Sequence, residues 1–196
     1  DICPHCGGMT EPQNKAHQLP LGSILKGRYL MGKALGEGGF GITYVGYDLL
    51  LQSKVAIKEY FPSNAANRSG ELVCPVQTGE DSSFQRGKKH FMREADILIS
   101  LQEVPNIVRI KDYFEENGTA YIIMEYLDGR DLRSFFLNNG TIGFNKAVEM
   151  LRPLMKALGQ VHEKGIIHRD ISPSNIMLLN NGEIRLLDFG AAIKAD

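Results

Sequence analysis

A glycine-rich run, Gly36-Glu37-Gly38-Gly39-Phe40-Gly41, lies between two short stretches of strand-like sequence and constrains the fold more than any other feature. Glycine lets a backbone approach phosphate groups closely and point its N–H groups at them. Because a strand and not a helix follows the run, it is not a dinucleotide-binding fingerprint. Taken alone, the run is compatible with a phosphate-binding loop or with a glycine-rich hairpin.

Alternating and short apolar stretches predict an antiparallel sheet with one helix after its third strand. The five predicted strands cover 28–35, 41–48, 54–60, 107–114 and 120–126. The helix is predicted over 84–101, and the polar stretch 61–83 is predicted to be a long connection. Further along, the pattern predicts helices over 131–138 and 144–163 and a hairpin of 176–179 with 184–187. Pro153 is expected to kink the longer helix.

Bulk composition narrows the class of protein. The chain has 196 residues, of which 43% are hydrophobic, enough for a sizeable core. Its net charge of -1 gives no bulk attraction to nucleic acid, and no apolar run reaches the roughly 18 residues of a membrane span. We therefore expect no nucleic-acid or membrane partner for this chain. Three cysteines do not make a disulfide framework, so we expect a reducing, cytoplasmic setting.

Lys58 ends the third predicted strand, in Val55-Ala56-Ile57-Lys58. An ammonium group at the end of an apolar strand needs partners, which phosphates and a carboxylate would supply. The alternative is a lysine that extends from a strand end into water. Glu94, on the helix that follows, is a candidate for the carboxylate, although alone it resembles an ordinary surface glutamate.

Two polar triplets follow the long helix. In His168-Arg169-Asp170 the aspartate precedes Asn175 by five residues, and Asp188 begins Asp-Phe-Gly after the next strand. Asp170 would orient or accept a proton from a hydroxyl, while carboxylate and amide oxygens at Asp188 and Asn175 suit a divalent cation. Either triplet alone is also compatible with a turn.

The order of these motifs is similar to that of eukaryotic-type protein kinases, and most like bacterial serine/threonine kinases, from about Arg28 to the C-terminus. This resemblance implies an α+β, protein-kinase-like fold with a five-stranded antiparallel N-lobe carrying one helix and a partial, mostly helical C-lobe. It implies a tail over 1–22, an N-lobe over 23–127 and a partial C-lobe over 128–196. The implied activity is ATP-dependent phosphoryl transfer to a serine or threonine of a protein substrate.

The resemblance also assigns roles to individual residues. Lys58 would hold the ATP phosphates and pair with Glu94, Asp170 would orient the substrate hydroxyl, and Asn175 and Asp188 would hold Mg²⁺. Leu98, His168 and Phe189 would stack in an apolar spine. The nucleotide contacts would come from Leu35, Gly36, Glu37, Gly38, Gly39, Phe40, Gly41, Thr43, Ala56, Lys58, Met124, Glu125, Leu127 and Met177.

Several positions depart from the family pattern. Thr43 replaces a usual valine, and Ser172 replaces the lysine expected two residues after the catalytic aspartate. The chain ends at Asp196, before a full activation segment, so we expect poor peptide phosphorylation by this chain and self-association through an exposed lower-lobe surface. The alternatives are an ATP-binding pseudokinase or interaction module, and a small-molecule kinase of the aminoglycoside-phosphotransferase type.

Cys3 and Cys6 form one Cys-x-x-Cys pair, similar to half of a zinc ribbon. A closed zinc site needs four ligands, and no second cysteine pair is present. His5 and His17 are candidates for the missing ligands, while Cys74 lies far along the predicted long connection. Zinc at this pair is therefore an alternative to a severed half-site or a loose tail.

Overall fold

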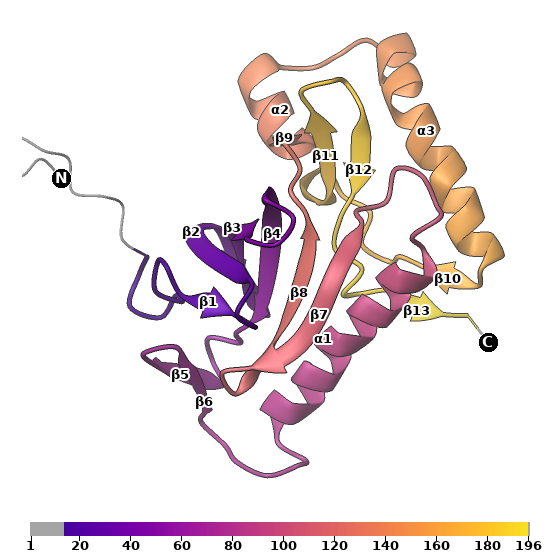
Figure 1. The fold of residues 1–196 in the computed structure, drawn as a ribbon. Helices are drawn as coiled ribbons and strands as arrows, with labels where there is room; N and C mark the ends of the chain where they lie inside the picture. Colours follow the sequence, from indigo (N-terminus) through magenta and orange to yellow (C-terminus); the bar gives the residue numbers. More distant parts are fainter. Residues whose placement is uncertain (1–13, 196) are drawn as a thin grey trace, which may run out of the picture. The chain divides into compact units, whose positions relative to one another are not determined.

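The computed structural model describes residues 14–195, which divide into two compact units. The first unit contains the described residues up to Lys88 together with Phe114–Tyr121, and the second contains Lys89–Tyr113 and the residues from Ile122 onward. The expected lobe boundary at 127–128 came from the family resemblance and not from the compactness of the units, and it stays a prediction. Each unit is described below by itself (Figure 1).

Antiparallel strands make up most of the first unit. They are β1 (Ile24–Leu25), β2 (Tyr29–Gly38), β3 (Gly41–Asp48), β4 (Ser53–Tyr60), β5 (Ala66–Ser69) and β6 (Leu72–Pro75). The sheet order is β1-β2-β3-β4-β8-β7, and the first unit contains the hairpin end of β7 (Ile110–Glu116) and β8 (Thr119–Glu125). The five expected strands are therefore present, and the two-residue β1 adds a sixth at the edge.

Alternation along β3 and β4 separates two faces of this sheet. Side chains at every second position of β4, at Val55, Ile57 and Glu59, are buried, while Ala56 and Lys58 between them are partly exposed. This is the pattern of strands that pack one face on a core. The buried Glu59 breaks the apolar character of that face, and its partners are described below.

The stretch 61–83 was expected to be one long connection, and the structure corrects this. It contains β5 and β6, which pair as a hairpin from Ala66↔Pro75 to Ser69↔Leu72. The hairpin has no apolar alternation to predict it. The N–H of Val73 donates to the carbonyl of Asn117 at 2.8 Å, which joins β6 to the turn between β7 and β8.

Residues 14–22 were expected to belong to a loose tail, but they pack against the rest of the first unit. Leu19 is fully buried, and the N–H of Gly22 donates to the carbonyl of Met31 at 3.0 Å. The segment packs mainly through polar contacts between side chains and backbone, which leave no apolar periodicity in the sequence.

Helices and short hairpins make up the second unit. Its elements, including those that it shares with the first unit, are α1 (Ser83–Ser100), β9 (Gly129–Asp131), α2 (Leu132–Asn139), α3 (Phe144–Glu163), β10 (Ile166–Ile167), η1 (Pro173–Asn175), β11 (Ile176–Leu179), β12 (Ile184–Leu186) and β13 (Ile193–Lys194). Asp131 caps α2, because its carboxylate accepts from the N–H of Ser134 at 2.8 Å. The sheet β12-β11-β9 packs beside the two later helices.

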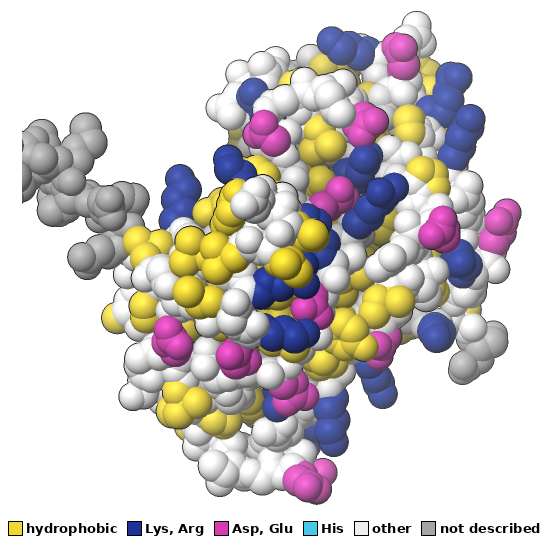
Figure 2. Space-filling view, in the orientation of Figure 1, with side chains coloured by type: hydrophobic (Ala, Val, Ile, Leu, Met, Phe, Trp, Pro, Cys, Tyr) yellow, Lys and Arg dark blue, Asp and Glu magenta, His cyan; other side chains and the backbone are white. Residues whose placement is uncertain are grey.

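The longest helix has the bounds that its apolar period predicts. On α3, Leu154, Ala157 and Val161 are buried, with the spacing of one helical face. Phe144 and Met155 are 81% and 55% exposed, and Figure 2 shows basic side chains along the outer side of the same helix. Self-association through such exposed residues stays a prediction. No helix within residues 14–195 combines the length and the apolarity that a membrane crossing requires.

Candidate functional site

The expected site residues fall in both units, and each group is described within its own unit. The glycine-rich loop, Thr43, Ala56 and Lys58 belong to the first unit, while the two triplets and Glu94 belong to the second. The expected pair of Lys58 with Glu94 joins residues of different units and therefore stays a prediction.

The glycine-rich loop closes the hairpin of β2 and β3. The ladder runs from Gly36↔Thr43 through Glu37↔Ile42 to Gly38↔Gly41, so the loop is paired up to its tip. Register on the other side of β3 places Thr43 opposite Lys58. Directly opposed residues of antiparallel strands lie on the same face, so Thr43 and Lys58 share one side of the sheet.

The structure requires glycine at one of the four glycine positions of this loop and leaves space for a side chain at the other three. A Cβ built on Gly41 would lie 2.3 Å from the carbonyl oxygen of Glu59, so close packing against β4 requires glycine there. A Cβ built on Gly36, Gly38 or Gly39 meets no atom within 4 Å, and none of the three has a positive φ. Neither packing nor backbone conformation requires glycine at these three positions. The space that side chains would fill is left open instead, which suits a ligand that approaches the backbone.

The loop of the His-Arg-Asp triplet is held by its own polar groups. His168 is buried, its Nδ1 accepts from the N–H of Asp170 at 3.2 Å, and its Nε2 donates to the carbonyl of Leu187 at 3.1 Å. These two bonds assign the proton of the neutral ring to Nε2. The ring also packs edge-on against Phe189, with centroids 4.6 Å apart. Leu98, the third expected member of the spine, is buried in the same unit.

Asp170 and Asn175 are brought together. The Nδ2 of Asn175 donates to Asp170 Oδ2 at 2.8 Å and to the Asp170 carbonyl at 3.0 Å. Because the amide nitrogen makes these bonds, the Oδ1 of Asn175 is the oxygen available to a cation. The backbone joins this loop to the next strand, since the N–H of Leu187 donates to the carbonyl of Asn175 at 2.8 Å.

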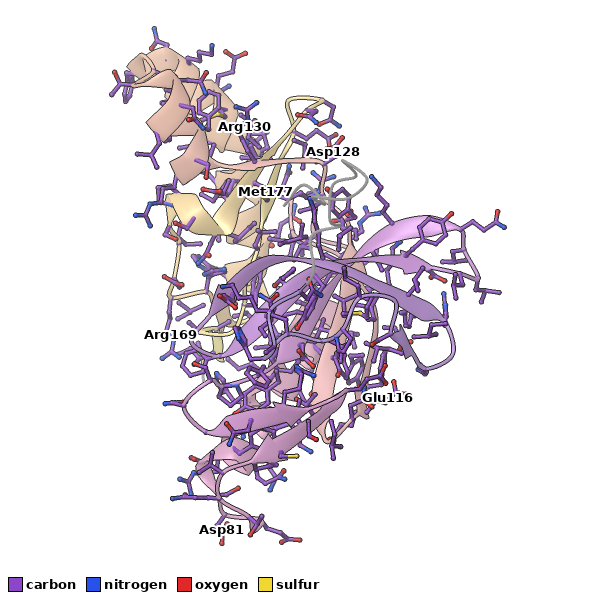
Figure 3. All side chains as sticks on the ribbon, turned by 90° about the vertical axis from the view of Figure 1, so that its left-hand side faces the viewer. Asp81, Glu116, Asp128, Arg130, Arg169 and Met177 are labelled. Carbon is purple, nitrogen blue, oxygen red and sulfur yellow. The ribbon has the colours of Figure 1, made fainter. Side chains whose placement is uncertain are left out.

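Two residues of the triplets adopt the left-handed conformation, which is uncommon for side chains other than glycine. Arg169 has φ 66° and Asp188 has φ 50°. The guanidinium of Arg169 donates through Nε to the carbonyl of Ala191 at 2.6 Å, and Asp188 Oδ1 accepts from the N–H of Gly190 at 3.2 Å. Such backbone strain concentrates at functional sites. Figure 3 labels Arg169 near the C-terminal strands.

Glu94 is buried and not an ordinary surface residue. It is 3% exposed on α1, and its Oε2 would lie 3.4 Å from a Cβ built on Gly190. A Cβ at Gly190 would be in ordinary contact with that carboxylate and would lie closer, at 3.1 Å, to Asp188 Oδ1. A pocket of about 420 Å³ in the second unit is lined by residues of α1, including Glu94, and by the chain after Phe189.

Met177 lies on the central strand of the sheet β12-β11-β9. It is opposite Asp131 of β9 on one side and Arg185 of β12 on the other. Figure 3 shows it near Asp128 and Arg130, where β9 begins. In the stretch that follows Met124, the N–H of Glu125 already donates to the carbonyl of Arg109 at 2.9 Å. The expected adenine contacts of Glu125 and Leu127 stay predictions.

The cysteine pair expected to bind zinc, Cys3 and Cys6, and the candidate ligand His5 lie outside the described residues. Within residues 14–195 no group of three or more His, Cys, Asp or Glu residues is placed to hold a metal ion. Nε2 of His17 lies 2.8 Å from Glu37, and Cys74 is a free cysteine on β6.

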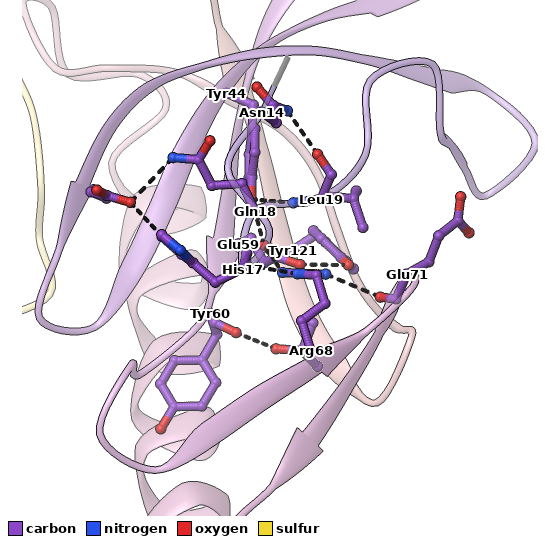
Figure 4. A network of polar contacts seen from close by, with 12 residues as sticks. Asn14, His17, Gln18, Leu19, Tyr44, Glu59, Tyr60, Arg68, Glu71 and Tyr121 are labelled. Atoms are coloured by element: carbon purple, nitrogen blue, oxygen red, sulfur yellow. Dashed lines mark hydrogen bonds and ion pairs between the residues drawn. The ribbon is translucent and has the colours of Figure 1, made fainter.

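Sequence reasoning missed a buried polar cluster on the core face of the first unit (Figure 4). Glu59 is fully buried, and its carboxylate accepts from Tyr44 and Tyr121, both at 2.9 Å. Arg68 of β5 completes the cluster with an ion pair to Glu59 at 2.6 Å. Burial raises the pKa of both tyrosines, and the neighbouring carboxylate adds to this effect, so the phenols stay protonated donors.

Comparisons with known proteins find similarity to protein kinases. The protein kinase domain family model matches residues 29–196. The chain is 33% identical to the serine/threonine-protein kinase PrkC of Bacillus subtilis over 172 residues, which are 88% of this chain and 24% of that protein. It is 35% identical to the serine/threonine-protein kinase PknB of Mycolicibacterium smegmatis over 188 residues, which are 94% of this chain and 26% of that protein.

A solved structure, described as the apo form of PpkA-294, has the same fold. It aligns with a TM-score of 0.82 at 34% identity, over 89% of this chain and 62% of that one. The chain thus spans about a quarter of the length of the curated relatives that it matches. With the family model covering residues 29–196 and the kinase motifs in order on these elements, the chain belongs to the protein kinase family.

Proposed function

We propose that this chain is the ATP-binding and catalytic part of a protein serine/threonine kinase. The observation that carries the proposal is the hydrogen-bonded pair of Asp170 and Asn175, in a loop held by the buried His168. A carboxylate held next to an amide, with its second oxygen exposed, can orient a hydroxyl and leave the amide oxygen for a cation. Relatives with the same motifs are named serine/threonine-protein kinases.

In this proposal each residue has one task. The open glycine positions Gly36, Gly38 and Gly39 let backbone N–H groups approach the ATP phosphates. Lys58 binds the phosphates and is oriented by Glu94. Ala56 and Met177, with Leu35, enclose the adenine, whose edge bonds to the backbone after Met124 at Glu125 and Leu127. Phe40 and Thr43 complete the contacts of the loop, and Glu37 contributes its backbone.

The residues present fit a magnesium ion. Asn175 Oδ1 and the exposed Asp188 carboxylate are hard oxygen donors of the kind that Mg²⁺ takes. Mg²⁺ supplies positive charge to the phosphate oxygens when bound. Asp170 then needs only to hold the substrate hydroxyl in line, because phosphoryl transfer depends on positioning and charge neutralisation more than on covalent help.

The proposed substrate is a serine or threonine hydroxyl of a protein, in the cytoplasm. A second function is favoured by one observation. Ser172, half-buried two residues after Asp170, brings no positive charge to the γ-phosphate. An ATP-binding pseudokinase would tolerate this replacement, and a transferase would need another cation there.

The test is a comparison of binding with transfer. Mg-ATP should raise the melting temperature, because any ligand of the native state does so, and Lys58→Ala or Asp188→Ala should remove most of that shift. In a full-length parent, radiolabel transfer to a generic basic protein should then depend on Asp170, measured against Asp170→Asn. Binding without any Asp170-dependent transfer would favour the pseudokinase, and an unchanged melting curve in millimolar Mg-ATP would refute both functions.

A further inference from the structure

Residues 14–18, named here the N-terminal strap, are attached to β2 where its pairing with β3 is irregular. The register of β2 shifts between Met31 and Ala34. There the side chain of Asn14 accepts from the N–H of Ala34 at 3.1 Å and donates to the carbonyl of Gly32 at 3.2 Å. The same amide donates to the carbonyl of Leu19 at 2.7 Å. One side chain thus replaces the backbone pairing that the irregular strand lacks and fixes the start of the strap.

The buried polar cluster fixes the other end of the strap (Figure 4). The N–H of the buried Leu19 donates to the hydroxyl of Tyr44 at 2.9 Å, and Arg68 Nε donates to the carbonyl of His17 at 2.7 Å. Tyr44 and Arg68 both bond Glu59, so the backbone of the strap is tied to the core of the first unit. A segment held at both ends in this way can present its side chains in fixed directions.

Three side chains of the strap converge on one carboxylate of the glycine-rich loop. Glu37 binds the ammonium of Lys15, Nε2 of His17 at 2.8 Å and Nε2 of Gln18 at 3.2 Å. A turn of the strap brings these groups together, since the N–H of Lys15 donates to Gln18 Oε1 and the N–H of Gln18 donates to the Lys15 carbonyl, both at 2.8 Å. The contacts with Lys15, His17 and Gln18 lower the pKa of Glu37 to about 2, so it is ionised near neutral pH.

The carboxylate of Glu37 lies on the opposite side of the sheet from Lys58. Across the ladder, Glu37 is opposite Ile42, and Ile42 is opposite Glu59 of the buried cluster. Thr43 and Lys58 form the neighbouring row, which faces the other way. The strap therefore grips the loop from the side away from Lys58 and leaves the loop backbone free to meet phosphates.

We propose that the N-terminal strap preorganises the glycine-rich loop for nucleotide, which makes Lys15, His17 and Gln18 positioning residues that act through Glu37. The inference rests on the proposed function, because it takes the ligand of the loop to be Mg-ATP. A glycine-rich loop loses more conformational freedom on ordering than other sequence does. A loop that is already held binds its ligand more tightly, since less ordering remains to be done on binding.

The first test needs no nucleotide. Lys15→Met with His17→Phe removes both polar groups, while a phenyl ring keeps the stacking of His17 on Phe61, whose ring centres are 6.1 Å apart. Amide hydrogen exchange over 36–41 should become faster by roughly three- to fivefold, as the loss of exposed charged contacts predicts. The matched control is Lys33→Ala, which removes an exposed lysine of β2 that does not contact Glu37. Its loop exchange and melting temperature should equal those of the wild type.

The second test measures Mg-ATP. The double variant should bind Mg-ATP more weakly by about the same factor as its loop exchange accelerates, with the melting temperature of the free protein unchanged. Lys15→Arg, which keeps a cation in reach of Glu37, should bind Mg-ATP as tightly as the wild type, whereas Lys15→Met should bind it more weakly. Coupling is reciprocal, so saturating Mg-ATP should also slow exchange in residues 14–19 of the wild type.

The outcomes separate the two proposals. If the wild type does not bind Mg-ATP, the proposed function fails, and the exchange experiment still reports whether the strap holds the loop. If the wild type binds Mg-ATP and the double variant binds it equally well, the strap has no positioning role and the inference is overturned. Unchanged exchange over 36–41 in the double variant would overturn it as well.

Discussion

Arg68→Met tests the ion pair of the first unit in which the buried carboxylate of Glu59 has a guanidinium partner that is itself buried. The substitution keeps an unbranched apolar stem but removes the 2.6 Å ion pair to Glu59 and the 2.7 Å bond to the carbonyl of His17. The side chains of Arg68 and Glu59 are 2% and 0% exposed, so water cannot replace the lost cation. Tyr44 and Tyr121 remain as donors to the carboxylate but carry no charge.

The expected cost is about 3–5 kcal/mol in the free energy of unfolding, because breaking a buried pair leaves an uncompensated charge in the core. Urea denaturation should show a lower midpoint with an unchanged slope. The control is Lys88→Met, which breaks a pair of similar length, 2.7 Å to Glu115, whose carboxylate side chain is 56% exposed. That control should cost at most about 1 kcal/mol.

A second substitution distinguishes the buried charge from lost packing. Adding Glu59→Gln to Arg68→Met removes both charges, so the double variant should be more stable than Arg68→Met alone. This arm also serves if Arg68→Met alone does not fold. If Arg68→Met lies within about 1 kcal/mol of the wild type, or if the two substitutions simply add, the ion pair does not have the role assigned here.

Three further results are expected. Burial raises the pKa of Tyr44 and Tyr121 above the roughly 10 of a free tyrosine, so the stability that the two protonated phenols contribute is complete below that pH and is lost as the pH rises further. The urea midpoint should therefore fall above about pH 10. It should fall less steeply in the variant with both tyrosines replaced by Phe. Gly41→Ala should lower the melting temperature, because its Cβ would lie 2.3 Å from a backbone oxygen of β4, whereas Gly38→Ala should leave the melting temperature unchanged and weaken Mg-ATP binding. Ser172→Lys should raise the rate of phosphoryl transfer in a full-length parent by adding positive charge near the γ-phosphate, and a flat or lower rate would show that another group already supplies it.

Local periodicity predicted the elements that repeat an apolar pattern over several turns or pleats. The helix 144–163 and the strand 41–48 were predicted with the bounds that the structure has. The β5–β6 hairpin was missed because β5 is mostly polar, with Arg68 pointing inward to a partner nine residues away, and β6 is a short run without alternation. Residues 14–18 were missed because amide and carbonyl groups, and not an apolar face, attach them to β2.

The candidate site shows the same division. The sequence put Asp170 and Asn175 five residues apart in one motif, and the structure bonds them at 2.8 Å, while the separate roles expected of them stay predictions. It did not predict that Glu94 is buried, because that depends on packing far away in the sequence. Glu59 was within reach of prediction, because it continues the buried alternation of Val55 and Ile57 and a charge on that face requires a partner.

The neighbouring charges of β4 also guard the strand against mispairing. In β-structure a slip of one residue exchanges the two faces, so apolar alternation alone penalises it only through lost burial. Here a slip of β4 against β3 would drive the ammonium of Lys58 into the core and withdraw Glu59 from its donors. The ammonium of Lys58 and the guanidinium of Arg68, which would have lost Glu59, would then be two uncompensated positive charges that oppose the misaligned state. The Lys58-Glu59 dipeptide thus favours the native register of β4 against β3.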